Sequence, residues 1–212
     1  MRALLVLALL GTSAYAGNNE VSFGSSIRAL PSSSADAITP DSMAGPAFTY
    51  ARALDLDLPI DGLRLWAQAS FEGGMATGTM FQTMQTDVSA VMVTAGAMLR
   101  YKVVRNVFAN ARVAFGGEET VLRLTDPMGN TARDHSFVGV ARGSGEVDVM
   151  FVDKPRFGIG LRVEFGYLAA GGAGLVPHRT QDDTLKIPLT EASIGHLDLS
   201  GPYATIGVMS QF

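Results

Sequence analysis

The chain offers few side chains that could carry out acid-base or nucleophilic chemistry. The best set lies in its last long polar segment, where His178, Asp182 and Asp183 are close together, and an imidazole beside carboxylates can activate water for hydrolysis. His135 directly precedes Ser136, so on an extended strand the two side chains point to opposite faces and cannot pair. Charged residues in an exposed loop are usually only solvated. We therefore expect no catalytic residue, and a hydrolase with a loop-borne His/Asp site is kept as an alternative.

Metal and cofactor chemistry is poorly represented as well. The chain has no cysteine, which excludes thiolate zinc sites, disulfides and cysteine nucleophiles. Asp55, Asp57 and Asp61 crowd one short segment, where their oxygens could hold calcium. Acidic side chains that keep a turn soluble are the more ordinary explanation. Residues 143–145 read Gly-Ser-Gly and lack the outer glycines of a nucleophile elbow. The sequence predicts no metal site and no bound cofactor.

The strongest chemical pattern is a set of arginines and carboxylates at alternating positions, interleaved with glycine. The chain has 13 arginines and only three lysines. Arginine is the better partner for carboxylates in desolvated surroundings, because its planar guanidinium forms bidentate pairs. Arg28 shares this pattern, and the glycines leave room for the long side chains. We predict that ten of these residues form a polar network inside the molecule: Arg64, Glu72, Arg100, Arg112, Glu118, Arg142, Glu146, Asp148, Arg162 and Glu164.

The segments that carry these charges alternate with a period of two. From Phe157 to Tyr167 every second residue is apolar, and the residues between them are glycine, Arg162 and Glu164. This is the pattern of a β-strand with one fully apolar face. Eight segments show it, four strongly and four weakly, at residues 20–29, 45–56, 63–71, 91–101, 107–115, 137–151, 157–167 and 200–212.

The connections between these segments alternate in length. Residues 57–62, 102–106 and 152–156 are short and contain Pro, Gly, Asn or Asp, the residues that turns use. Residues 31–44, about 78–90, about 119–136 and about 170–199 make long connections. An even number of antiparallel strands with short turns at one end and long loops at the other is typical of a transmembrane β-barrel. The predicted fold is all-β: an antiparallel up-and-down barrel of eight strands with short periplasmic turns and long extracellular loops.

Aromatic residues support a membrane location, because they lie near both ends of the predicted strands. Bilayers select two such girdles at their interfaces. Aromatic side chains scattered through an ordinary core are the alternative. The predicted girdles contain Tyr101, Phe151, Phe157 and Phe212 at the short-turn end, and Phe71, Phe115, Phe165 and Tyr167 toward the long-loop end.

Composition agrees with this fold and excludes several classes of protein. Of the 212 residues 47% are hydrophobic, 17% are charged and 24 are glycine, so the chain has less charge and more glycine than soluble domains have. The net charge of -4 gives no basis for nucleic-acid binding. Apolar residues at 3–10 followed by Ala14-Tyr15-Ala16 predict a signal peptide that is cleaved after Ala16. The predicted barrel domain then covers residues 17–212, and no later segment is apolar for long enough to span a membrane as a helix.

The mature chain resembles the small eight-stranded outer-membrane β-barrels of diderm bacteria, the OmpA/OmpX/OmpW-like group. Its last ten residues end in Phe212 with apolar residues at alternate positions before it, although Ser210 departs from the usual apolar third-from-last residue. The resemblance implies that the barrel assembly machinery reads this terminus and that the protein is a monomer among outer-membrane lipids and lipopolysaccharide. The function expected is non-enzymatic: structural, envelope-integrity or surface-interaction.

Two features remain open in this interpretation. An eight-stranded barrel has an interior just wide enough for side chains, which favours a salt-bridged, largely closed lumen over a narrow channel for small solutes. Specific activity would then reside in the long loops, because binding residues usually collect on loops that a rigid scaffold presents. A functionless loop is an equal alternative. The candidate loop surface comprises His178, Arg179, Asp182, Asp183 and Lys186.

Overall fold

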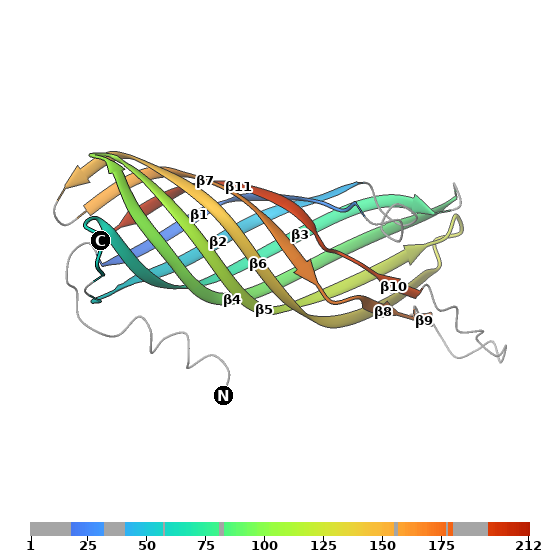
Figure 1. Ribbon diagram of the computed structural model, residues 1–212. Helices are drawn as coiled ribbons and strands as arrows, with labels where there is room; N and C mark the ends of the chain where they lie inside the picture. Colours follow the sequence, from blue (N-terminus) through green and yellow to red (C-terminus); the bar gives the residue numbers. More distant parts are fainter. Residues whose placement is uncertain are drawn as a thin grey trace, which may run out of the picture.

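The protein is described here from a computed structural model, in which it is an all-β barrel (Figure 1). The structure describes residues 18–31, 41–56, 58–80, 83–154, 157–176, 178–179 and 195–212. Within these ranges no helix is long and apolar enough to cross a membrane. The predicted signal peptide and the segment with Asp182, Asp183 and Lys186 lie outside the described residues.

Eight long strands make the barrel wall. Each strand pairs antiparallel with its neighbours in the order β5-β4-β3-β2-β1-β11-β7-β6, and a further pairing of β5 with β6 closes the ring. The predicted eight-stranded antiparallel barrel is therefore confirmed. The strands are β1 (Asn19–Ala29), β2 (Ser42–Leu54), β3 (Leu63–Met80), β4 (Met84–Val104), β5 (Val107–Thr125), β6 (Thr131–Lys154), β7 (Phe157–Ala170) and β11 (Gly201–Gln211).

The strands are strongly tilted relative to the barrel axis. Following the register partners once around the barrel from Val107 leads back to β5 at Gly117, ten residues farther along the strand. In a barrel of eight strands this stagger corresponds to a tilt of roughly 40°. Phe212 lies at the end of the barrel where the short turns are (Figure 1). There it exchanges backbone hydrogen bonds with Asn19, at N–O distances of 3.0 and 2.9 Å, which ties the last strand to the first.

Four strands continue far beyond the bounds that the sequence predicted. β3 and β4 continue to Met80 and Met84, and β5 and β6 to Thr125 and Thr131. The expectation of long loops at about 78–90 and about 119–136 is therefore wrong, because most of these residues form two extended hairpins. Three short strands lie at the same end of the barrel: β8 (Ala173–Leu175), β9 (His178–Arg179) and β10 (Gly195–Leu197).

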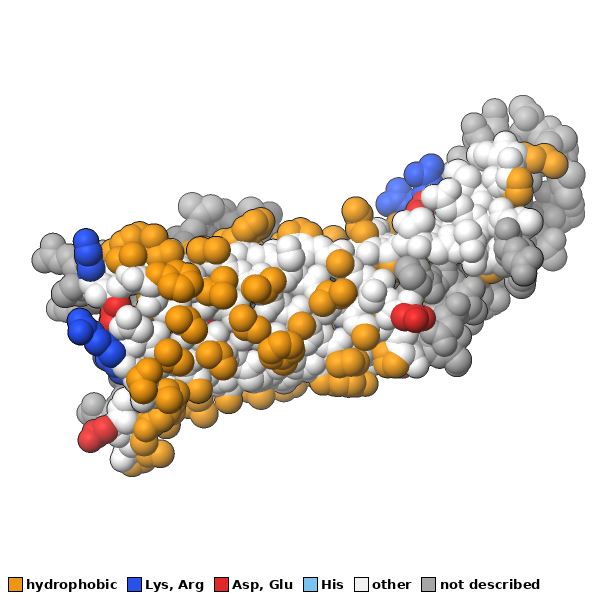
Figure 2. All heavy atoms as spheres, turned by 90° about the horizontal axis from the view of Figure 1, so that it is seen from above, with side chains coloured by type: hydrophobic (Ala, Val, Ile, Leu, Met, Phe, Trp, Pro, Cys, Tyr) orange, Lys and Arg blue, Asp and Glu red, His pale blue; other side chains and the backbone are white. Residues whose placement is uncertain are grey.

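The sequence did not predict the extended hairpins because the apolar residues move from the outward face of the strands to the inward face. Between the short turns and the level of Phe115, the residues that face outward are apolar, and apolar side chains cover this part of the wall in Figure 2. Beyond it the outward residues are mostly polar, such as Ser89, Glu119 and Arg123, whereas Val88 and Leu122 face inward and are 1% and 0% exposed. The hairpins thus have the pattern of a water-soluble sheet with an apolar interior. We infer that they stand outside the bilayer.

Candidate functional site

The barrel interior is the most densely charged part of the described chain. Near the short turns Arg162 binds Asp148 with two nitrogens, Nε to Oδ1 at 2.8 Å and Nη2 to Oδ2 at 2.8 Å, and reaches Glu20 at 2.6 Å. Arg100 binds the same two acids, at 2.5 Å to Glu20 and 2.7 Å to Asp148. Asn110 donates to Asp148 at 2.7 Å. We call this group the lower cluster; it consists of Glu20, Arg100, Asn110, Glu146, Asp148 and Arg162.

A second group fills the next level of the lumen. Arg142 binds Glu72 and, at 2.7 Å, Glu164, and its Nε donates to the hydroxyl of Tyr203 at 2.8 Å. Tyr203 in turn donates to Glu164 at 2.5 Å. Because every hydrogen bond here joins different strands, the group fixes the barrel wall from within. This middle cluster consists of Ser70, Glu72, Arg112, Arg142, Glu164 and Tyr203.

One ion pair lies above these two groups. Arg28 donates to Glu118 at 2.7 Å and to the carbonyl oxygen of Leu199 at 3.3 Å. We call Arg28 and Glu118 the upper pair. Among the described residues the three levels contain five buried arginines and six buried carboxylates, so the charges nearly cancel. Such pairing is required, because an unpaired charge without water costs several kcal/mol (about 3–5).

Apolar side chains close the lumen on both sides of the charged levels. Toward the short turns Trp66 and Met98 are 1% and 0% exposed, and the guanidinium of Arg100 lies 4.6 Å from the centre of the Trp66 ring. Toward the long hairpins a larger group surrounds the upper pair and continues beyond it. We call it the outer plug; its buried members are Leu30, Met43, Ala76, Val88, Ala90, Met92, Leu122, Val138, Val140, Leu168, Ala173, Leu175, Leu197 and Leu199, and Tyr203 joins it to the middle cluster.

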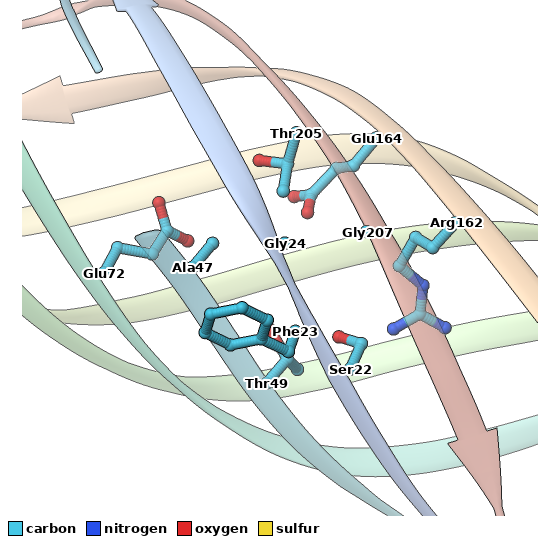
Figure 3. A pocket seen from close by; sticks show the side chains of 10 residues that line it. All are labelled: Ser22, Phe23, Gly24, Ala47, Thr49, Glu72, Arg162, Glu164, Thr205 and Gly207. Carbon is cyan, nitrogen blue, oxygen red and sulfur yellow. The ribbon is translucent and has the colours of Figure 1, made fainter. Parts of the chain in front are cut away.

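A small pocket remains between the lower and middle clusters, on the side of β1, β2 and β11 (Figure 3). Its wall combines Ser22, Gly24 and Ala47 with the charged side chains of Glu72 and Arg162. The small residues explain the space, since the charged side chains that line it come from the neighbouring strands β3 and β7. A pocket of this size, with charged groups in its wall, has room for about one ordered water molecule.

The structure brings together nine of the ten residues predicted for the interior network. Arg64 is the exception: it is exposed at the short-turn end and takes part in none of the ion pairs found among the described residues. Arg64 is the register partner of Arg100, so it lies on the predicted face of its strand. It stands at the mouth of the barrel, however, where an exposed guanidinium needs no carboxylate partner.

Two charged members of the network were absent from that prediction. Glu20 is 1% exposed and binds two arginines, and Arg28 belongs to the upper pair. Arg28 shares the polar pattern in the sequence, and the alternation of Glu20, Ser22, Gly24, Ser26 and Arg28 in β1 was the signal that could have identified Glu20 as well.

The aromatic residues predicted for the two girdles all face outward. Phe115 and Phe151 are both 67% exposed, and the other six are between 44% and 65% exposed. Phe157 and Phe165 lie eight residues apart on β7, which is about 20 Å along the axis of a barrel with this tilt. That separation suits the outward apolar band of such barrels, about 25 Å tall. Phe23 and Phe48, which the sequence analysis did not assign, are also exposed.

The candidate loop surface is described only at its beginning. His178 and Arg179 form β9, which pairs with β6 so that His178 is the register partner of Arg133 and Arg179 that of Ala132. The described residues contain no group of three or more His, Asp or Glu side chains arranged to hold a metal ion.

Comparison with known proteins gives structural neighbours only. No protein-family model matches the chain, and no curated protein matches its sequence. Ail, the attachment invasion locus protein of Yersinia pestis, superposes with a TM-score of 0.51 at 12% identity, over 93% of this chain and 99% of Ail. A structure of Ail in complex with the heparin analogue sucrose octasulfate gives 0.52 at 13% identity over the same shares. Neisserial surface protein A (NspA) gives 0.50 at 10% identity, over 94% of this chain and 100% of NspA.

These similarities extend over nearly the whole length of each neighbour and concern the fold. Together with the apolar outer band and the charged interior, they make the protein a small eight-stranded transmembrane β-barrel of the bacterial outer-membrane type.

Proposed function

We propose that the protein is a non-enzymatic outer-membrane barrel that acts at the cell surface and whose lumen is closed. The outer plug carries this proposal. Ions that passed the upper pair would have to cross a layer of tightly buried apolar side chains, among which Leu30, Leu122 and Leu168 are 0%, 0% and 1% exposed. Moving an ion into such surroundings is strongly unfavourable.

The surface role rests on the extended hairpins. Nothing in a purely structural barrel requires four strands to continue well beyond the apolar band, whereas a rigid sheet that stands above the bilayer can present side chains to other molecules. Two structural neighbours support this direction: one is a surface protein by name, and the other is an attachment protein also seen with a heparin analogue.

Export and assembly complete the proposal. We infer that residues 1–16 form the export signal and that Phe212 is read by the barrel assembly machinery, with the protein remaining a monomer in contact with lipids and lipopolysaccharide. The exposed ring of Phe212, at the seam between β1 and β11, supports this role.

Conductance across a planar bilayer tests the closed lumen. Purified barrel is expected to give no stable single-channel steps, because both ends of the charged interior are sealed. A variant with Leu122→Asp and Val88→Asp opens the outer plug and serves as the positive control. Stable conductance by the unmodified protein would favour the alternative of a narrow channel for small solutes.

A further inference from the structure

A cationic site stands on the outer face of the β5–β6 hairpin. Arg123 and Arg133 are exposed register partners on adjacent strands, so their side chains leave the same face of the sheet side by side. Like charges that are directly opposed destabilise a sheet. Neither arginine takes part in an ion pair found among the described residues, which distinguishes them from the arginines of the lumen.

Charged side chains near this pair are few among the described residues. Besides the two arginines themselves, Asp87 of β4 and Glu119 of β5 lie on the same face. Asp87 is the register partner of Arg123, and its carboxylate also accepts hydrogen bonds from Thr77 at 3.0 Å and Gln85 at 3.4 Å. Asp87 therefore offsets part of the charge of Arg123, whereas no carboxylate is a register partner of Arg133 among the described residues, so the positive charge is concentrated at Arg133.

Two exposed aromatic side chains and one exposed carboxylate lie on the outer face between the membrane and this site. Phe115 belongs to the outward apolar band, and Phe137, 74% exposed, lies farther out on the same face. The ring of Phe137 covers Gly117, where any side chain would collide with it. Glu119 is the register partner of Phe137 and stands below the arginines, four residues from Arg123 along β5. Chains that pack on Phe115 would thus bring an attached head group past Phe137 to the two arginines.

We propose that Arg123 and Arg133 bind a phosphate group on the sugar head group of lipopolysaccharide in the outer leaflet. The pair fits this ligand because guanidinium groups bind phosphates in bidentate fashion, and a bound anion removes the repulsion between the two cations. The position fits as well: Arg123 lies eight residues beyond Phe115, about 20 Å along the axis, at the level of sugars rather than acyl chains. This inference rests on the surface role proposed above and assigns a ligand and its residues.

The test compares two variants that each remove two exposed arginines, at opposite ends of the barrel. The full chain, folded in detergent micelles, is titrated with fluorescently labelled lipopolysaccharide that retains its phosphates. Arg123→Ala with Arg133→Ala is expected to weaken binding by about tenfold or more, which is about 1.4 kcal/mol. Arg64→Ala with Arg105→Ala, an exposed pair at the short-turn end, removes the same charge and is expected to leave binding unchanged. Heat-dependent electrophoretic migration verifies that each variant is folded.

Chemical removal of the phosphates identifies the ligand group. Dephosphorylated lipopolysaccharide is expected to bind the parent and the Arg123/Arg133 variant equally and weakly. Without lipopolysaccharide, the Arg123/Arg133 variant should unfold at the same temperature as the parent or at a higher one, since it lacks the like-charge pair. Adding lipopolysaccharide should raise the unfolding temperature of the parent by more than that of the variant. Equal binding by parent and variant would overturn the assignment, as would equal loss in the Arg64/Arg105 control. A dependence on the two arginines that is seen only with a sulfated oligosaccharide would overturn it too. None of these results bears on the conductance measurement.

Discussion

Replacing Arg28 with leucine is the sharpest test of the charged interior, because Glu118 is 0% exposed and Arg28 is the hydrogen-bond partner that the structure shows for it. Removing one member of a buried ion pair costs about 3–5 kcal/mol. A carboxylate left without its cation can take up a proton instead, and for a glutamic acid in water this costs ~4 kcal/mol at pH 7.4 and ~1.6 kcal/mol at pH 5.5. We therefore expect Arg28→Leu to lower the free energy of unfolding by about 3 to 4 kcal/mol at pH 7.4.

The pH dependence has a definite sign. Protonation becomes less costly as the pH falls, so the deficit of Arg28→Leu relative to the parent should shrink to about 1.5 to 2 kcal/mol at pH 5.5. Arg28→Leu combined with Glu118→Leu should lie within about 1 kcal/mol of the parent, because two leucines extend the adjoining outer plug. Arg64→Leu is the control, since Arg64 is exposed, and should change stability by no more than about 0.5 kcal/mol.

Equilibrium unfolding in urea, followed by tryptophan fluorescence in detergent micelles, measures these four proteins and the single variant Glu118→Leu. If Arg28→Leu is as stable as the parent at pH 7.4, Arg28 does not stabilise the buried carboxylate of Glu118. The same holds if the double variant loses the sum of the two single losses, because the two side chains would then not be coupled.

Three further predictions concern single positions. Gly96→Ala should cost about 1–3 kcal/mol, because its new Cβ would overlap the carbonyl oxygen of Val113, whereas Gly145→Ala, with nothing within 4 Å of its Cβ, should be nearly neutral; urea unfolding separates the two. Tyr203→Phe should cost about 1–3 kcal/mol in the same assay, since it removes a hydroxyl that bonds two charged groups of the middle cluster. Trp66, the single tryptophan, is 1% exposed, so acrylamide should quench its fluorescence weakly in the folded barrel and strongly in urea; equal quenching in both states would contradict its place in the lumen.

The sequence alone determined which face of each strand meets lipid. Side chains alternate strictly along a strand, so the parity of Phe157, Leu161 and Phe165 against Arg162 and Glu164 is a local property that survives any arrangement of the strands. The bilayer imposes the same alternation on every strand, and for this reason the barrel, its strand number and nine of the ten interior residues could be predicted.

Only the tertiary structure decided which charges meet. Arg100 binds Glu20, 80 residues away along the chain, because the tilt and stagger of the strands bring the two to one level of the lumen. The same stagger leaves Arg64 at the mouth, although its parity matches that of Arg100. Axial level depends on the whole ring of strand pairs, and no local pattern contains it.

The tertiary structure also decided where the membrane pattern ends. At Val88 and Leu122 the apolar residues change to the inward face, because the strands have left the lipid and must bury apolar surface inside the barrel rather than expose it. Within a short stretch of sequence, alternating apolar and polar residues look the same on both sides of this boundary. What such a stretch lacks is the distance along the barrel axis, which determines whether lipid or water lies outside the wall.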